Sequence, residues 1–190
     1  DRLRSRGLGD VYKRQIQYLT ENADHVIIQT PYVICNGYMY DVLQGISDHA
    51  KLQIVLNAVE KGSNPWGCTD YLNQKKKILE TGADVYELMN DYPVHTKAVL
   101  INDRLSVVGS YNLDMRSTYL DTELMLVIDS EKLNQQIHET ESDYMEKSKE
   151  VLANGQETEG AKYQGKVLNR KKKLYYGVLR IIIRPLRQLL

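Results

Sequence analysis

Four side chains in one stretch of the sequence suit the cleavage of a phosphodiester bond. His95 and Lys97 are two residues apart, and Ser110 and Asn112 have the same spacing further along. Imidazole titrates near neutral pH, so a histidine can act there as a nucleophile or a general acid. A lysine, a hydroxyl and an amide can donate hydrogen bonds to the charge that develops on phosphoryl oxygens. These residue types predict phosphoryl transfer, with His95 and Lys97 as the first candidates.

Two apolar strands are expected to position these side chains. Alternate residues of a strand share a face, so His95 and Lys97 point the same way, and Ser110 and Asn112 share a parity just past the second strand. Gly109 leaves room for a ligand or a backbone segment to approach closely. The residues expected to bury both strands are Val99, Leu100, Ile101, Leu105, Val107 and Val108.

A carboxylate on the next expected strand, residues 119–129, is a further candidate. Glu123 stands among apolar residues, and a buried carboxylate needs a partner. Holding the second ring nitrogen of His95 would satisfy it and stabilise the imidazolium. An ion pair with a structural arginine such as Arg116 is the alternative.

The remaining segments predict an α/β fold, a layered mixed β-sheet flanked by helices. Strands are expected at 25–30, 52–58, 84–89, 94–101, 105–109 and 119–129. Helices are expected at 16–23, 38–50 and 131–152, and a further helix is expected to run through Tyr71 and Ile78 and to end at Gly82. Strands of such sheets end at ligand crevices, so Pro31 and Tyr32 after the first strand, and Trp66 in the loop 61–68, are candidate substrate contacts.

The central motif resembles a known family. The pattern His-x-Lys-x4-Asp-x6-Gly-Ser-x-Asn resembles the HKD motif of the phospholipase D superfamily, with Asn102 in the place of the aspartate and Asp103 directly after it. The continuation NLDMRSTYLDTE, which ends at Glu123, and the upstream QTPY resemble the cardiolipin synthase branch. The likeness spans about residues 16–150. In the family the motif aspartate is thought to be structural, which implies a structural role for Asn102.

This resemblance implies a phosphatidyltransferase that acts on an anionic, phosphatidylglycerol-like phospholipid through a phosphohistidine. It implies no cofactor and no metal for that chemistry. The family's site uses two HKD motifs across a pseudo-twofold axis, where one histidine attacks phosphorus and the other protonates the leaving group. This chain has one copy, because His25, His49 and His138 lack the rest of the motif and are expected to be structural. The chain is therefore expected to supply half a site, completed by an upstream half or by a second copy.

Two other functions stay open. One is a single-motif phosphodiesterase or nuclease that works as a homodimer, and the other is a non-catalytic, membrane-associated half-domain. Residues 16–160 contain 23 acidic and 11 basic residues, which argues against a nucleic-acid partner because backbone binding is electrostatic.

The two ends of the chain differ in character from residues 16–152, the expected catalytic half-domain. Residues 1–15 resemble translated adapter sequence and are expected to be a non-native leader. Residues 153–190 are expected to be a polar linker, 153–160, followed by a basic amphipathic tail, 161–190, with nine basic residues and no acidic one.

The tail predicts a helix that binds a membrane surface. Lys173, Arg180, Arg184 and Arg187 fall on one helical face, opposite apolar residues, which is typical of attachment to anionic lipid. The alternative is a helix docked on the acidic body. Two cysteines without a pairing pattern favour a reduced compartment, so the expected location is the cytoplasmic face of a bacterial cell membrane.

Overall fold

The computed structural model describes residues 15–187 and contains one mixed sheet of eight strands, in the order β6-β5-β4-β1-β2-β3-β7-β8. The strands are β1 His25–Gln29, β2 Lys51–Asn57, β3 Asp84–Leu88, β4 Ala98–Ile101, β5 Leu105–Gly109, β6 Met125–Asp129, β7 Ser148–Val151 and β8 Glu157–Glu159. The helices are α2 Gly37–Ser47, α3 Pro65–Glu80, α4 Met115–Tyr119, α5 Glu131–Glu146 and α6 Arg170–Leu186, preceded by a helical segment at 15–20. Residues 1–14 of the expected leader lie outside the described residues.

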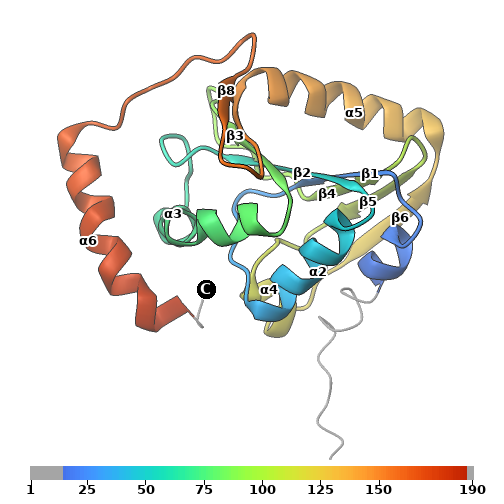
Figure 1. Ribbon diagram of the computed structural model, residues 1–190, viewed down its shortest axis with the longest axis horizontal. Coiled ribbons are helices and arrows are strands. Elements are labelled where there is room, and N and C mark those ends of the chain that lie inside the picture. The colour runs from blue at the N-terminus through green and yellow to red at the C-terminus, as the bar shows by residue number, and fades with distance from the viewer. Residues whose placement is uncertain (1–14, 188–190) are drawn as a thin grey trace, which may run out of the picture.

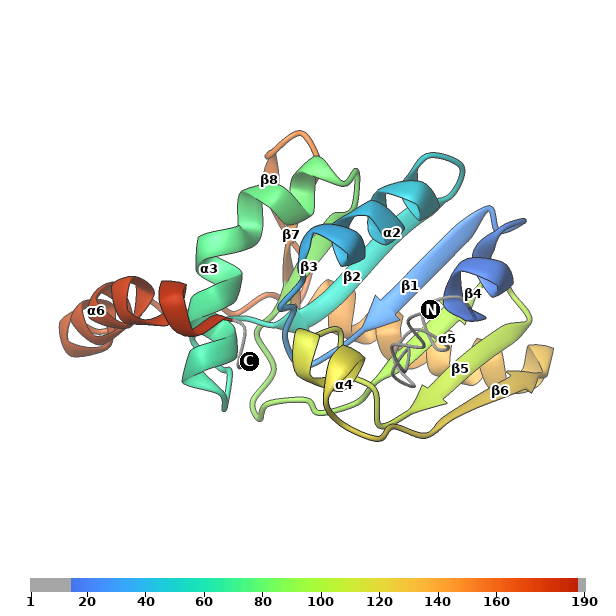
Figure 2. The same ribbon diagram turned by 90° about the horizontal axis from the view of Figure 1, so that it is seen from below.

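Helices cover both faces of the sheet, as Figures 1 and 2 show, with α2, α3 and α4 on one side and α5 on the other. The strands β1, β2 and β3 are parallel, and β4 pairs with β1 in the antiparallel direction. This arrangement confirms the expected α/β fold with a layered mixed sheet.

The apolar runs form the central strands because both faces of those strands are buried. On β1, Ile28 belongs to the main core, whereas Ile27 packs in the smaller cluster on the α5 side. On β2, Ile54 and Val55 divide between the same two clusters. The α5 helix is capped by Ser130, whose hydroxyl accepts a hydrogen bond from the Leu133 N–H.

Four expected segments differ in the structure. The strand expected at 94–101 begins at Ala98, and the one expected at 119–129 begins at Met125, because residues up to Tyr119 form α4. The helix expected at 131–152 ends at Glu146, because the next residues pair with β3 as β7. The polar stretch 153–160 is no linker but a hairpin, in which Gly155 has a positive φ of 83° and β8 pairs with β7. The sheet thus continues to Glu159.

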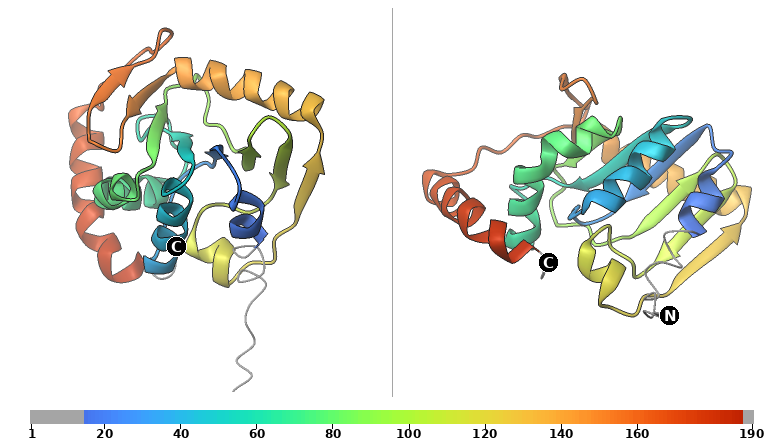
Figure 3. Two further views of the ribbon diagram at one scale, coloured as in Figure 1. Left: turned by 45° about the vertical axis from the view of Figure 1, so that its right-hand side comes forward. Right: turned by 60° about the horizontal axis from the view of Figure 1, so that its bottom comes forward.

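The α6 helix lies against α3 (Figures 1 and 3). Its buried residues are Tyr176, Leu179 and Ile183. The Arg187 guanidinium pairs with the buried Asp70 carboxylate at 2.7 Å, which supplies that carboxylate with a cation. In the described residues no helix is long and apolar enough to cross a membrane.

The expectation of four basic side chains on a free face is therefore wrong in part. Arg180 donates to the Asn73 side chain at 2.9 Å, and Arg187 is engaged by Asp70, so both face the body. Lys173, Arg180 and Arg184 are exposed, although the contact with Asn73 holds Arg180 against the body. The docked arrangement, the alternative from the sequence, is the one found, because the buried apolar side chains of α6 fasten it to α3.

Candidate active site

The candidate catalytic residues lie at one edge of the sheet. His95 and Lys97 directly precede β4, Ser110 and Asn112 follow β5, and Glu123 precedes β6. Antiparallel pairing of β4 with β5, and of β5 with β6, brings these segments to the edge at which β1 and β2 end. The short helix α4 lies beside this edge (Figure 2).

His95 and Lys97 are in direct contact. The Lys97 Nζ lies 2.6 Å from His95 Nδ1 and donates a hydrogen bond to the His95 carbonyl oxygen at 2.8 Å. Partial burial of the ring, together with the neighbouring ammonium, holds the pKa of His95 below its ordinary value. A lower pKa keeps the imidazole neutral, the form in which it can act as a nucleophile.

Lys97 is the buried member of this pair, with 8% of its surface exposed, whereas His95 is exposed. Burial lowers the pKa of Lys97, and the negative charges of Glu123 and Asp114 oppose that effect. Glu123 is itself buried. The described geometry thus connects Glu123 with Lys97 through charge, while its predicted hold on the His95 ring stays a prediction.

Ser110 and Asn112 are fixed by different neighbours. The Ser110 hydroxyl accepts a hydrogen bond from the Leu124 N–H at 3.0 Å, which ties it to the segment that leads into β6. The Asn112 amide donates to the Ser117 hydroxyl at 3.3 Å, while its Oδ1 is buried and has no hydrogen-bond partner among the described residues. The unpartnered end of this amide is thus the acceptor oxygen, and the NH2 end is the donor.

The packing of β5 against the neighbouring strand requires a glycine at position 109. A Cβ at this position would collide with the Leu124 carbonyl oxygen and with Met125. Of the two expected reasons for a glycine, the close approach of a backbone segment applies in the structure.

Asn57, a residue that the sequence reasoning missed, positions the histidine segment. Its side chain accepts a hydrogen bond from the Val94 N–H and donates to the Val94 carbonyl, both at 2.8 Å. It also donates to the Pro31 carbonyl at 3.1 Å. The end of β2 thus holds both the residue before His95 and the loop after β1. The signal was present as an asparagine that ends an apolar strand.

A second missed residue is Asp114, the N-cap of α4. Its carboxylate accepts a hydrogen bond from the Ser117 N–H at 2.5 Å, and burial raises its pKa. The Ser117 hydroxyl in turn accepts a hydrogen bond from the backbone N–H of Asn112 at 3.3 Å. Asp114 therefore orients the turn that carries Asn112.

The expected substrate contacts gather at the same edge. Pro31 is buried and accepts a hydrogen bond from Asn57, while Tyr32 is half-buried and packs on Gly67, at which a Cβ would come within 2.8 Å of the tyrosine ring. Trp66, adjacent to that glycine at the start of α3, is 39% exposed. The structure brings the three residues together, and their contact with substrate stays a prediction.

Asn102 lies at the opposite end of β4. It adopts a positive φ of 49°, and its side-chain oxygen accepts hydrogen bonds from the N–H groups of Asp24, at 2.9 Å, and His25, at 3.2 Å. This placement supports the structural role that the sequence implied, because the residue ties the turn after β4 to the start of β1.

Comparison with known proteins identifies the family. The family model described as "Cardiolipin synthase, PLD-like domain" matches residues 15–143. Cardiolipin synthase A of Proteus mirabilis is 30% identical over 150 residues, which are 76% of this chain and 29% of the relative. Cardiolipin synthase A of Serratia proteamaculans is 28% identical over 152 residues, 77% of this chain and 29% of the relative. The chain thus spans less than a third of the length of these curated relatives.

Solved structures share the fold. The phospholipase D family member Nuc from Salmonella typhimurium superposes with a TM-score of 0.60 at 15% identity, over 73% of this chain and 89% of that one. Phosphatidylserine synthase from Haemophilus influenzae superposes with a TM-score of 0.67 at 16% identity, over 95% of this chain and 45% of that one.

Proposed function

The chain belongs to the phospholipase D-like domain family of cardiolipin synthases, and we propose that it supplies one half-site of a phosphatidyltransferase that acts on anionic phospholipids. The observation that carries the proposal is the contact of His95 with the buried Lys97, close to the charge of Glu123. Ser110 and Asn112 stand at the same edge of the sheet.

The proposed reaction proceeds in two displacements. In the first, a histidine nitrogen forms a bond to phosphorus as the bond to the leaving oxygen breaks, and the histidine of the other half gives that oxygen its proton. In the second, the acceptor hydroxyl passes its proton to that histidine and attacks phosphorus, and the bond between nitrogen and phosphorus breaks. His95 serves in one of these roles.

Lys97 and Asn112 serve the phosphoryl group. An ammonium held in a partly buried site stabilises negative oxygens more strongly than it does in water. The Asn112 side-chain NH2 group, which donates one hydrogen bond to the Ser117 hydroxyl at 3.3 Å, has a second N–H to donate to a phosphoryl oxygen. These groups require no metal for the displacement, and Glu123 keeps Lys97 charged by opposing the effect of its burial.

Exposed apolar side chains on the outermost strand β6, and just before it, support the need for a second half. Among the described strands β6 pairs only with β5, and it begins beside the Ser110–Leu124 contact. Leu124, Leu126 and Val127 are each about half or more exposed. Apolar side chains grouped on an edge strand are typical of a surface that packs against another domain or subunit. An upstream half of the same protein, or a second copy of this chain, would cover them.

We further propose that α6 contacts the membrane with the face opposite to its docked side. Its outer side chains Leu174, Val178, Ile181 and Ile182 are exposed, between 48% and 72%. Lys173 and Arg184 are exposed on the same helix, and they suit anionic headgroups. The proposed location is the bacterial cell membrane, since the relatives are bacterial, and its cytoplasmic face, since Cys35 and Cys68 are free thiols.

Product analysis on phosphatidylglycerol vesicles tests this function. The longest reading frame that contains this chain is incubated with labelled phosphatidylglycerol, and the lipids are separated by chromatography and identified by mass. Formation of cardiolipin with release of glycerol is the expected result, and phosphatidic acid would indicate water as the acceptor.

A single-stranded DNA oligonucleotide and a vesicle-binding assay serve as the control arms. Cleavage of DNA without any lipid product would contradict the phosphatidyltransferase and favour the homodimeric nuclease. Vesicle binding without any product in either assay would instead favour the non-catalytic, membrane-associated half-domain.

A further inference from the structure

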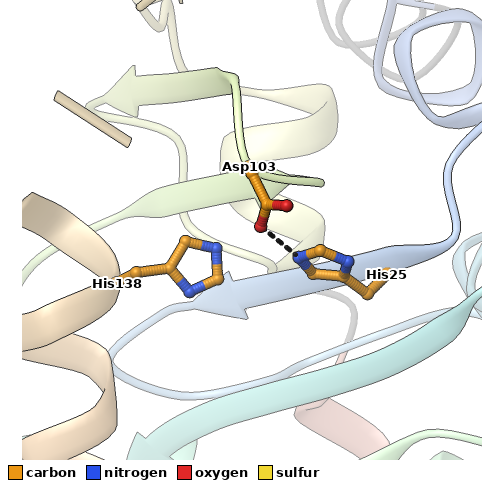
Figure 4. A group of neighbouring side chains, drawn as sticks. All are labelled: His25, Asp103 and His138. Carbon is orange, nitrogen blue, oxygen red and sulfur yellow. Dashed lines mark ion pairs between the residues drawn. The ribbon is translucent and has the colours of Figure 1, made fainter. Parts of the chain in front are cut away.

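Three metal-ligating side chains converge at the end of the sheet opposite to His95. His25 begins β1, Asp103 lies in the turn between β4 and β5, and His138 projects from α5. Figure 4 shows the two rings and the carboxylate pointing toward one another. The three residues come from elements far apart in the sequence, so the fold itself creates the cluster.

The spacing of these side chains suits a small divalent cation. One ligand atom from each residue lies within 4.8 Å of the other two, and His25 Nε2 is 3.5 Å from Asp103 Oδ1. The two rings are inclined by 58° with centroids 5.7 Å apart, so they are not stacked. Around Zn²⁺ with bonds of about 2.0–2.1 Å, tetrahedral ligands lie about 3.3 Å apart. Reaching that spacing requires the two imidazole rings to rotate toward each other as well as a rotation of Asp103, whose side chain is 94% exposed.

The backbone around the cluster is already fixed by Asn102. Its side-chain oxygen accepts the His25 N–H, and its own N–H donates to the His25 carbonyl at 3.0 Å. Its carbonyl oxygen lies 3.3 Å from His138 Nε2. One residue therefore joins the three elements that carry the ligands. Binding then orders few additional groups, because the backbone is held in place beforehand.

We propose that His25, Asp103 and His138 bind one Zn²⁺-type ion, with solvent in the remaining position. Two imidazoles and one carboxylate are a donor set that zinc accepts. Coordination through His138 Nδ1 leaves Nε2 to donate to the Asn102 carbonyl, whereas coordination through Nε2 replaces that contact. The ion fastens β1, the turn after β4 and α5 to one another, and its role is structural because the site lies at the far end of the sheet from His95.

Zinc titration of the complete, tag-free chain tests this proposal. The thermal midpoint of unfolding is measured against ZnCl₂ concentration, and stoichiometry comes from calorimetry. Co²⁺ absorption in the visible range reports the geometry around the metal. We expect one ion per chain, a midpoint that rises with zinc, and an affinity lower by at least about tenfold in His25→Ala and in His138→Ala.

The control variant is His49→Ala, since His49 is an exposed histidine outside the cluster, whose Nε2 lies 2.8 Å from the Thr20 carbonyl. This variant should retain the zinc affinity of the parent. A His95→Ala variant shows whether zinc binds at the exposed His95 instead of at the cluster. This variant too should retain the zinc affinity of the parent. Equal zinc affinity of the parent, His25→Ala and His138→Ala would overturn the site, as would the absence of saturable binding in the parent. In either case His25 and Asp103 form only an ion pair.

Discussion

The contact between the Lys97 ammonium and the His95 ring sets the protonation state of the candidate nucleophile. Partial burial and the positive charge of Lys97 together disfavour the imidazolium. Lys97→Gln removes the charge, so the pKa of His95 should rise. The measurement is an NMR titration of the His95 ring, with His49 as the internal reference. A His95 pKa that stays constant or falls in the variant would show that the two side chains are not electrostatically coupled.

Asn102 provides a second test at the residue scale. Asn102→Asp keeps an acceptor oxygen for the N–H groups of Asp24 and His25, and aspartate tolerates a positive φ. We expect turnover to stay nearly unchanged. Asn102→Ala removes the acceptor and should lower the free energy of unfolding by roughly 1–3 kcal/mol. Both quantities are measured by urea unfolding and initial rates. A large loss of turnover in Asn102→Asp at unchanged stability would contradict the structural role.

At this scale the sequence predicted the residues with distinctive chemistry and missed those that hold them. His95 and Lys97 could be named because their spacing and the downstream glycine, serine and asparagine form a pattern. Asn57 and Asp114 act through backbone groups of other segments, and only the fold brings those segments within reach. Nothing local to an asparagine at the end of an apolar strand tells which loop it will bind.

At the scale of elements, α5 carries a buried carboxyl group. Glu141 is 1% exposed, its Oε2 has no hydrogen-bond partner in the described part of the chain, and burial raises its pKa to about 8. The folded state therefore holds this proton more tightly than the unfolded state, whose group titrates near its ordinary value. The contribution of this group to the free energy of unfolding is fully present below the pKa of the unfolded state. It is lost as the pH rises toward the folded-state pKa of about 8, above which no more of it remains to be lost.

Glu141→Gln should remove this dependence, because the amide does not ionise. At pH 8 the variant should be more stable than the parent by on the order of 4 kcal/mol, with little difference at pH 4. Urea unfolding at the two pH values provides the comparison. A parent and a variant whose free energies of unfolding change in parallel with pH would show that Glu141 is ionised in the folded protein.

The elements with strong apolar runs could be predicted from the sequence. The elements that form only because they pair with a neighbouring strand, or because a cap begins them, could not. The runs of β1 and β2 indicate buried strands on their own. The sequence SKEV of β7 has no strand pattern of its own, and it forms a strand because it pairs with β3. The sequence therefore predicted that the helix would continue to residue 152. The α4 helix depends on its Asp114 cap, and its last residue, Tyr119, is the residue at which the next strand was expected to begin.

At the scale of the whole molecule, α6 has a docked face and an outer apolar face. Leu174→Ser with Ile181→Ser should reduce sedimentation with phosphatidylglycerol vesicles, because both side chains lie on the outer face and are about 70% exposed. Lys173→Gln with Arg184→Gln should weaken the preference for anionic over neutral vesicles, since each basic residue near the surface contributes about 1 kcal/mol. Val167→Ser, an exposed residue before the helix, is the matched control. Equal sedimentation of all these chains would contradict membrane contact by α6.

The central claim is that His95 performs chemistry within a site made of two halves. The most direct test is the initial rate of phosphatidyl transfer by the protein that contains both halves, measured for the parent, His95→Ala and His49→Ala. If His95 forms or protonates the reacting bond, its replacement should lower the rate by about a thousandfold or more, while His49→Ala stays near the parent. Both variants should unfold at the parent's midpoint. A folded His95→Ala protein that retains a rate within about tenfold of the parent would contradict the account.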